Sequence, residues 1–131
     1  MILVDSSVWI DYFNGKETRQ TNWLDTSLGQ IPVLMGDLIL TEVLQGFKND
    51  KEFGIAKDLL FGLPFMAMGG KALALDSAKN YRTLRKNALT VRKTIDVIIG
   101  TFCIHYHLPL LHDDKDFEPM VNLLGLKAVV G

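Results

Sequence analysis

The sequence has little cysteine: a single residue, Cys103, among 131. An intrachain disulfide is therefore excluded. Because Cys103 lies within an apolar stretch, we expect a buried, reduced thiol. Such cysteine use favours a cytoplasmic protein, since disulfides belong to oxidising compartments.

We also expect neither a targeting segment nor a membrane span. The N-terminal residues MILVDSS have no basic region and reach an acid at residue 5, so we expect no signal peptide. The longest apolar stretch carries Asp96, His105 and His107, which argues against a membrane span. Internal repeats, low-complexity tracts and linkers are absent as well. We therefore expect one domain over residues 1–131, long enough to bury a core.

The chain carries almost no net charge. Its formal charge is −1, with 48% hydrophobic and 22% charged residues, which is ordinary for a soluble globular protein. A balance of this kind does not indicate a nucleic-acid partner. Evidence for such a partner has to come from local charge.

What the sequence does contain is an alternation of short apolar segments and helical patterns. Strands are predicted at 2–4, 31–35, 63–68, 108–112 and 127–130. Helices are predicted at 8–13, 17–28, 38–47 (capped by Asp37), 51–61, 71–89, 94–107 and 115–124. Buried strands that alternate with helices favour an α/β fold, with a mostly parallel central sheet and helices on both faces.

Acidic residues follow two of the predicted strands. Asp5 comes directly after the first strand, and Asp113, Asp114 and Asp116 follow the strand at 108–112. Ligands of open α/β sheets gather at the carboxyl ends of strands. The two acidic positions therefore indicate a site at one edge of the sheet.

Two further acids lie inside helices that are otherwise apolar. Glu42 is flanked by leucine, isoleucine and valine, and Asp96 is the only charge between residues 95 and 104. Carboxylates packed together with Asp5 and the aspartates near 114 would repel one another and resist ionisation. Mg²⁺ or Mn²⁺ removes this conflict, because both prefer carboxylate and water oxygens. Such sites act on phosphate esters by activating water and stabilising in-line displacement.

Each acid also has a simpler structural explanation. For no site to exist, all of these explanations would have to be true at once. They are a helix cap for Asp5, a solvated helix face for Glu42, an ion pair with Arg92 or Lys93 for Asp96, and a cap of the next helix for Asp114 and Asp116.

Four segments, in this order and spacing, resemble the PIN-domain ribonucleases of the VapC toxin type. They are ILVDSSVWIDYF, LTEVLQGF, RKTIDVIIGTFCIHYHLPLLHDDKDF and LKAVV, and with their spacers they span essentially the whole chain. The resemblance implies a compact PIN-like fold and a Mg²⁺- or Mn²⁺-dependent endoribonuclease that hydrolyses RNA phosphodiester bonds. It also implies the toxin of a type II toxin–antitoxin pair, with a small cognate antitoxin protein as its inhibitor and a homodimer as its assembly.

The resemblance also assigns site residues by position. The catalytic acids that it implies are Asp5, Glu42, Asp96 and Asp114, with Asp116 as a fifth metal ligand and Ser6 or Ser7 as a hydroxyl beside the first aspartate. The segment HDDKDF holds an extra acid, Asp113. Asp114 and Asp116 are favoured as ligands because they keep the family's spacing to Phe117.

A local excess of basic residues precedes Asp96. Between Asp76 and Asp96 there is no acid but six cations: Lys79, Arg82, Arg85, Lys86, Arg92 and Lys93. Such a segment can position RNA through its phosphates without reading its sequence. We predict RNA binding by Arg82, Arg85, Lys86, Arg92 and Lys93. The alternative is an ordinary solvated helix face.

Other interpretations stay open beside the leading one. A PIN-like module could bind RNA or protein without cutting, although an idle site need not keep repelling acids. A phosphatase on a similar sheet would be expected to carry an Asp-x-Asp pair where this chain has DSS. A zinc site at His105, His107 or His112 would need more nitrogen or sulfur ligands. The aromatic residues Trp9, Tyr12 and Phe13 favour core packing, with an antitoxin-binding groove as the alternative.

Overall fold

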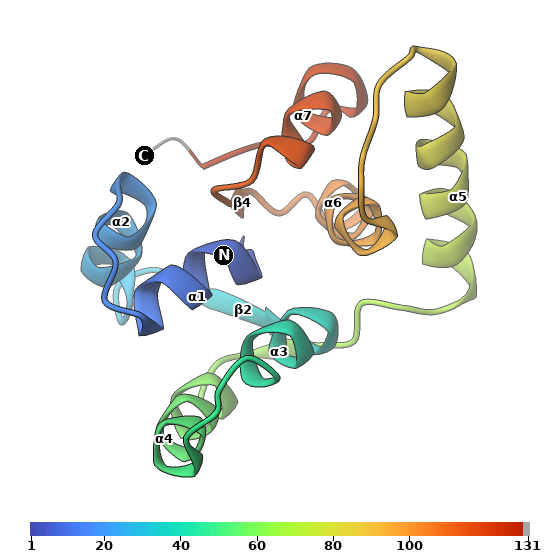
Figure 1. The fold of residues 1–131 in the computed structure, drawn as a ribbon. Coiled ribbons are helices and arrows are strands. Elements are labelled where there is room, and N and C mark those ends of the chain that lie inside the picture. Colours follow the sequence, from blue (N-terminus) through green and yellow to red (C-terminus); the bar gives the residue numbers. More distant parts are fainter. Residues whose placement is uncertain (130–131) are drawn as a thin grey trace.

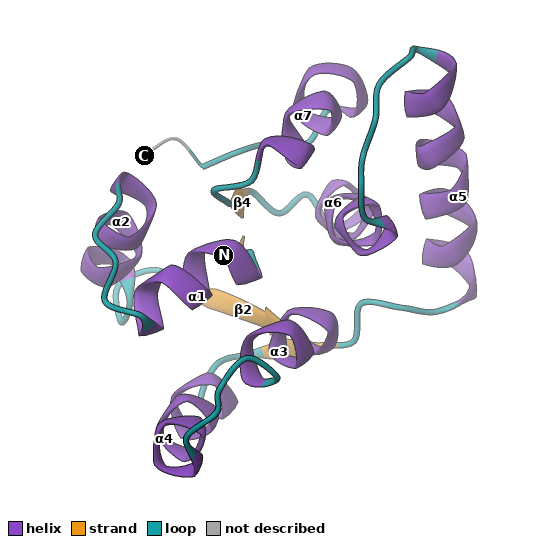
Figure 2. Cartoon of the chain, viewed as in Figure 1, coloured by secondary structure: helices purple, strands orange, loops and turns teal. Residues whose placement is uncertain are grey.

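In the computed structural model, which describes residues 1–129, short strands alternate with helices along the chain (Figures 1 and 2). The elements are β1 (Ile2–Val4), α1 (Ser6–Phe13), α2 (Arg19–Ser27), β2 (Val33–Gly36), α3 (Asp37–Leu44), α4 (Asp50–Phe61), β3 (Phe65–Met66), α5 (Lys71–Lys86), α6 (Thr94–Tyr106), β4 (Leu110–Leu111), the 3₁₀ helix η1 (Lys115–Phe117) and α7 (Glu118–Leu124).

The strands form one parallel sheet in the order β3-β2-β1-β4. Each residue of β1, β2 and β4 is buried, so both faces of these strands are covered. This confirms the predicted α/β class with a parallel sheet between helices. β1 lies at the centre, between β2 and β4, and its carboxyl end delivers Asp5 to the edge where β4 also ends.

Two predicted details are wrong. The strand predicted at 127–130 is reduced, within the described residues, to a single bridge between Ala128 and Leu110, and residue 130 lies outside them. Asp37 does not cap α3, because Gly36 occupies the cap position and Asp37 is the first helical residue. The Asp37 carboxylate instead accepts from the Met68 backbone N–H at 2.9 Å, which ties the chain after β3 to the start of α3.

The core lies between the sheet and its helices. Trp9 is completely buried, and Phe13 stacks on it with ring centroids 5.9 Å apart. The aromatic residues of α1 therefore pack in and against the core, as predicted. Cys103 is a free, buried thiol, and burial raises its pKa well above the usual range. Within residues 1–129, no helix combines the length and apolar character that crossing a membrane requires.

Candidate active site

Asp5 stands where β1 ends and α1 begins. It is the N-cap of α1, and its Oδ2 accepts from the Ser7 backbone N–H at 3.0 Å and from the Ser7 hydroxyl at 2.6 Å. The other oxygen, Oδ1, is buried and has no hydrogen-bond partner. Capping and site formation are therefore not alternatives, because one oxygen caps the helix while the second stays free for a ligand.

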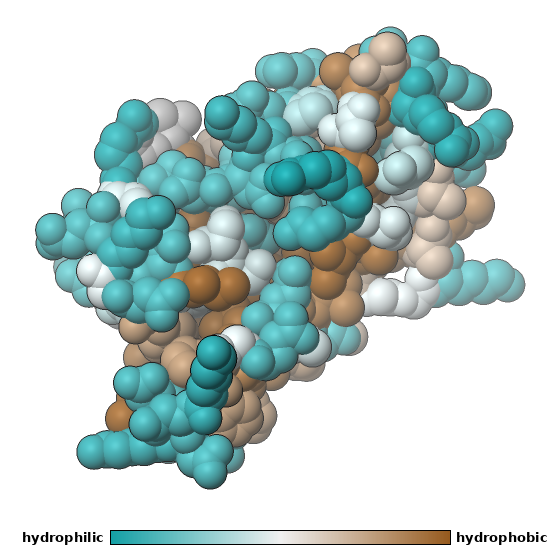
Figure 3. All heavy atoms as spheres, in the orientation of Figure 1, coloured by the Kyte–Doolittle hydropathy of each residue, from teal (hydrophilic) through white to brown (hydrophobic). Residues whose placement is uncertain are grey.

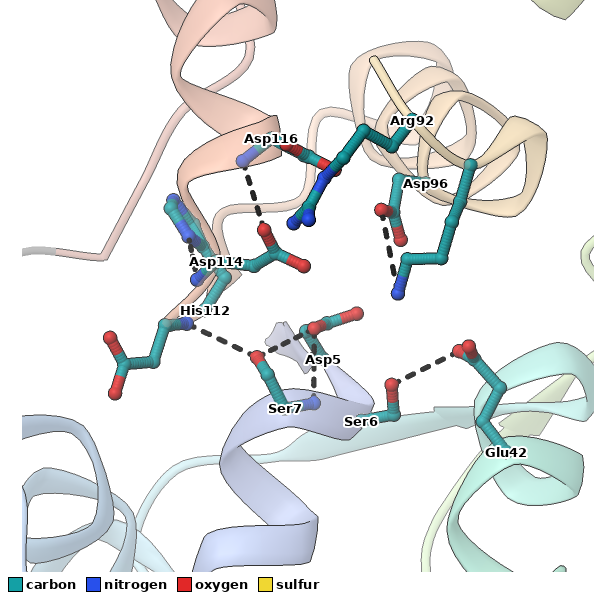
Figure 4. Close-up of polar contacts among 11 residues, drawn as sticks. Asp5, Ser6, Ser7, Glu42, Arg92, Asp96, His112, Asp114 and Asp116 are labelled. Carbon is teal, nitrogen blue, oxygen red and sulfur yellow. Dashed lines mark hydrogen bonds and ion pairs between the residues drawn. The ribbon is translucent and has the colours of Figure 1, made fainter.

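Glu42 comes from the middle of α3 and is held by a serine of the DSS motif. The Ser6 hydroxyl donates to Glu42 Oε1 at 3.0 Å. The two consecutive serines thus have separate partners, since Ser6 orients Glu42 and Ser7 orients Asp5 (Figure 4). The glutamate is directed toward the site, so the solvated-face interpretation of Glu42 is incomplete.

Asp96 lies in the first turn of α6 and is almost completely buried. Its Oδ2 accepts no hydrogen bond, and the Lys93 ammonium lies 3.8 Å away. The predicted alternative, an ion pair with Arg92 or Lys93, is thus present for Lys93. It does not satisfy the carboxylate, because 3.8 Å is too long for a hydrogen bond.

Asp114 is the N-cap of η1, shortly after β4 ends, and Asp116 lies within η1. Asp114 Oδ1 caps the turn by accepting from the Asp116 backbone N–H at 2.9 Å. One carboxylate oxygen from each of Asp96, Asp114 and Asp116 falls within 4.8 Å of the others. We call these three residues the aspartate triad. Figure 4 shows the carboxylates of Asp5 and Glu42 directed toward the same space.

The adjacent Asp113 has a different place. Its side chain is exposed, and its backbone N–H donates to the Ser7 hydroxyl at 3.2 Å. This bond joins the loop after β4 to the start of α1. The geometry therefore separates Asp113, which contributes a backbone donor, from Asp114 and Asp116, which contribute carboxylates.

Burial and mutual repulsion raise the pKa values of three of the acids, Asp5, Glu42 and Asp96. Burial raises the pKa of Asp96 to about 7, with further increases from Asp5, Asp114 and Glu42 against the lowering effect of Lys93. The pKa of Asp5 is raised by burial, although the Ser7 hydrogen bonds oppose this. Burial likewise raises the pKa of Glu42, against the Ser6 hydrogen bond. A group of carboxylates that resists ionisation is one that a cation would stabilise.

The donor set fits a hard divalent cation. The converging ligands are all carboxylate oxygens, and two buried oxygens, Asp5 Oδ1 and Asp96 Oδ2, lack hydrogen-bond partners. Mg²⁺ and Mn²⁺ favour such oxygen ligands. His105, by contrast, lies in the last turn of α6, at the end of the helix opposite Asp96. The arrangement can therefore hold a cation beside a phosphate ester.

Comparison with known proteins agrees with this architecture. The PIN domain family matches residues 2–121, which is most of the chain. The chain belongs to the PIN domain family. Two curated relatives, ribonuclease VapC11 of Mycobacterium tuberculosis and VapC ribonuclease Mb1587 of Mycobacterium bovis, are each 27% identical over 130 residues, covering 98% of this chain and 97% of theirs.

Solved structures of VapBC and VapC proteins show the same fold. VapBC2 from Rickettsia felis, bound to a promoter DNA fragment, matches with a TM-score of 0.77 and 15% identity over 98% of both chains. VapC20 of Mycobacterium tuberculosis, a toxin that cleaves the sarcin–ricin loop, matches with a TM-score of 0.70 and 14% identity over 100% of both. These findings confirm the resemblance to the VapC type that four sequence segments indicated.

The structure brings together the acids that the sequence singled out, along with both serines. The predicted RNA-binding residues divide into two groups. Arg82, Arg85 and Lys86 are exposed on α5, whereas Arg92 and Lys93 contact the acids themselves. Sequence reasoning gave the Lys93 pair as one explanation of Asp96, but it missed the pair between Arg92 and Asp116. It considered His112 only as a zinc ligand and did not predict that its Nδ1 accepts from the Asp114 backbone N–H at 3.3 Å.

Proposed function

We propose that this PIN protein is a Mg²⁺- or Mn²⁺-dependent endoribonuclease. The observation that carries the proposal is the aspartate triad with the unpartnered, buried oxygen of Asp5 beside it. The names of the VapC relatives, which are ribonucleases, support RNA as the substrate.

The proposed roles follow from the contacts. Asp96, Asp114 and Asp116 would hold the cation, with Asp5 Oδ1 and Glu42 completing the acidic set. When bound, the cation lowers the pKa of water and stabilises charge on the scissile phosphate. Ser6 and Ser7 keep Glu42 and Asp5 in one orientation, and groups that hydrogen-bond to metal ligands in this way tune metal affinity.

The rival interpretation is a PIN module that binds RNA or protein without cutting. Such a module would gain nothing from keeping Asp5, Glu42 and Asp96 together at raised pKa values. Burying mutually repelling carboxylates lowers stability unless a ligand compensates. The cost of this cluster therefore favours an active, metal-binding site.

The direct experiment is RNA cleavage by the purified protein. We expect cleavage with Mg²⁺ or Mn²⁺ and none with EDTA, because the acids alone cannot activate water next to an anionic phosphate. Restoring Mn²⁺ in excess over EDTA should restore cleavage. Cleavage by a homogeneous preparation that persists in EDTA would contradict the proposed mechanism.

We propose that the basic segment, residues 79–93, guides RNA to this site. Arg82, Arg85 and Lys86 project from α5 into solvent and belong to a segment that continues to α6, where the triad begins. Arg85 lies over the ring of Tyr81, 5.8 Å from its centroid, so part of this surface can also stack against bases. Phosphate contacts from such residues make RNA affinity fall with salt.

A toxin–antitoxin role is the biological context that we propose, with a small protein partner as the inhibitor and a homodimer as the assembly. Its support is the likeness to structures of VapBC complexes. An apolar surface on α4 and β3 is the candidate partner face, and Figure 3 shows apolar side chains over α4. Ile55, Leu59, Phe61 and Phe65 are 60%, 42%, 65% and 56% exposed. A hollow of about 350 Å³ lies beside Phe61 and Phe65.

Ile55→Asp should weaken binding of the proposed antitoxin protein by about thirtyfold, the effect of losing one apolar anchor. Cleavage and melting temperature should not change, because Ile55 is already exposed and lies away from the triad. Leu75→Asp on α5, 56% exposed, is the matched control. Titration calorimetry with light scattering measures partner affinity and oligomeric state together. Equal partner affinity for the two variants would remove α4 from the interface.

A further inference from the structure

Both ion pairs found within residues 1–129 end on the acidic cluster, which is the aspartate triad together with Asp5 and Glu42. Arg92 Nε lies 3.2 Å from Asp116 Oδ2, and Lys93 Nζ lies 3.8 Å from Asp96 Oδ2. Asp96 and Asp116 are two of the three members of the aspartate triad. Two consecutive cations from one short segment therefore contact two of the carboxylates that a divalent ion would need.

The two sides of these pairs differ in how freely they can move. The side chains of Asp96 and Asp116 are 3% and 12% exposed, whereas those of Lys93 and Arg92 are 53% and 75% exposed. Asp96 is fixed by α6 and Asp116 by η1, while the two cations lie in the non-helical connection before α6. The side chains of Arg92 and Lys93 can therefore move away without exposing the hydrophobic core, whereas those of Asp96 and Asp116 stay in place.

These ion pairs are also weak, so another cation can readily replace Arg92 and Lys93 at the carboxylates. Ion pairs with an exposed partner contribute little stability, because water and salt screen them. The Lys93 charge does lower the pKa values of Asp96 and Glu42, so it offsets part of the repulsion in the cluster. A divalent ion at the same oxygens offsets more of it than two peripheral monovalent charges do.

We propose that Arg92 and Lys93 are resident counter-cations of the acidic cluster, that a divalent metal ion displaces them from Asp116 and Asp96, and that the displaced side chains then bind RNA phosphates. The inference rests on the proposed nuclease function and deepens it, because metal binding would free two cations of the RNA-binding surface. Coupling of this kind is reciprocal, so RNA that engages Arg92 and Lys93 should also favour metal binding.

The test compares two double variants that remove the same charge from the same segment. Arg92→Gln/Lys93→Gln removes the two contacts with the acids, and Arg85→Gln/Lys86→Gln removes two exposed charges of α5 that form no ion pair within the described residues. Mn²⁺ alone is titrated into each protein by calorimetry at fixed ionic strength. We expect Mn²⁺ affinity to rise about fivefold for Arg92→Gln/Lys93→Gln, since two competing ion pairs are lost, and to stay within about twofold for the control.

RNA affinity gives the second readout, and it is measured first in EDTA, where no cleavage is expected. There Arg92→Gln/Lys93→Gln should bind RNA like the wild type, because its missing cations were engaged with the acids. The control double variant should bind RNA more weakly, since its phosphate contacts do not depend on metal. With Mn²⁺, both variants should show a raised KM for cleavage.

The possible outcomes distinguish a failure of this inference from a failure of the proposed nuclease function. A wild type that binds no Mn²⁺ and cleaves no RNA would overturn both. A wild type that binds Mn²⁺, with equal affinities in the two double variants, would overturn the counter-cation role alone. Should the double variant fail to fold, Lys93→Gln by itself decides the matter, because the Lys93 side chain makes no capping hydrogen bond to α6.

Discussion

Asp114→Asn should reduce RNA cleavage by at least about a hundredfold, while Asp113→Asn should leave it within about twofold. Loss of groups that merely support a metal ligand commonly costs about 10–100-fold, so loss of a ligand's charge should cost more. The two residues are adjacent, and both changes remove one negative charge. Only Asp114 belongs to the aspartate triad, and Asp113 is exposed.

The asparagine substitutions preserve the local hydrogen bonds. In Asp114→Asn the side-chain amide keeps an oxygen that can accept from the Asp116 backbone N–H, as Asp114 Oδ1 now does, so η1 should remain capped. The bond from residue 113 to the Ser7 hydroxyl comes from the backbone and is independent of its side chain. Initial rates on one RNA at saturating Mn²⁺ measure both variants. Equal losses would show that overall charge near β4, rather than ligation by Asp114, determines activity.

The acids of the site could be predicted because each has an unusual place in the sequence pattern. Asp96 interrupts an apolar helix, Glu42 does the same in α3, and Asp5 and Asp114 follow strands whose ends meet at one sheet edge. These features depend on short-range pattern and on general sheet topology, both of which can be inferred from a single sequence.

The details that could not be predicted depend on tertiary contacts. The apolar residues that indicate helix α5 include Ala72, Leu75 and Ala78, yet all three are exposed. The buried face of α5 carries Leu84, which belongs to that apolar pattern, together with Leu73 and Ser77, which do not. Periodicity establishes that a helix forms, but the neighbouring α6 decides which face it covers. The extent of a strand likewise depends on tertiary contacts, because Ala128 forms a single bridge with Leu110 and the pairing does not extend further within the described residues.

The separate roles of Ser6 and Ser7 were likewise out of reach from the sequence. Both hydroxyls lie beside Asp5 in the chain, and nothing in the motif DSS says which one bonds the aspartate. The structure directs Ser7 to Asp5 and Ser6 to Glu42, which is 36 positions away from Ser6 in the sequence. Only the packing of α1 against α3 makes the second contact possible.

Asp96→Asn should raise the melting temperature of the metal-free protein at pH 8. The pKa of Asp96 in the folded protein is raised from 3.8 to about 7, so its contribution to stability is fully present below pH 4 and is lost as the pH rises to about 7. Between about pH 4 and pH 7, the Asp96 carboxyl is ionised in the unfolded chain but keeps its proton in the native protein. The full cost above pH 7 is at most roughly 4 kcal/mol, since one pKa unit corresponds to about 1.4 kcal/mol.

Asparagine removes this cost, and it also removes the Lys93 pair, which is worth less than about 1 kcal/mol because Lys93 is half exposed. The net gain should be several degrees at pH 8 in EDTA and should vanish near pH 4. Added Mg²⁺ should then stabilise Asp96→Asn less than the wild type, because stabilisation by a ligand grows with its affinity. Melting curves at both pH values, with EDTA and with Mg²⁺, measure these differences, and Asp58→Asn on the exposed face of α4 is the control. A variant that melts well below the wild type in EDTA at pH 8 would instead make Asp96 a structural partner of Lys93, since breaking a needed buried pair lowers stability.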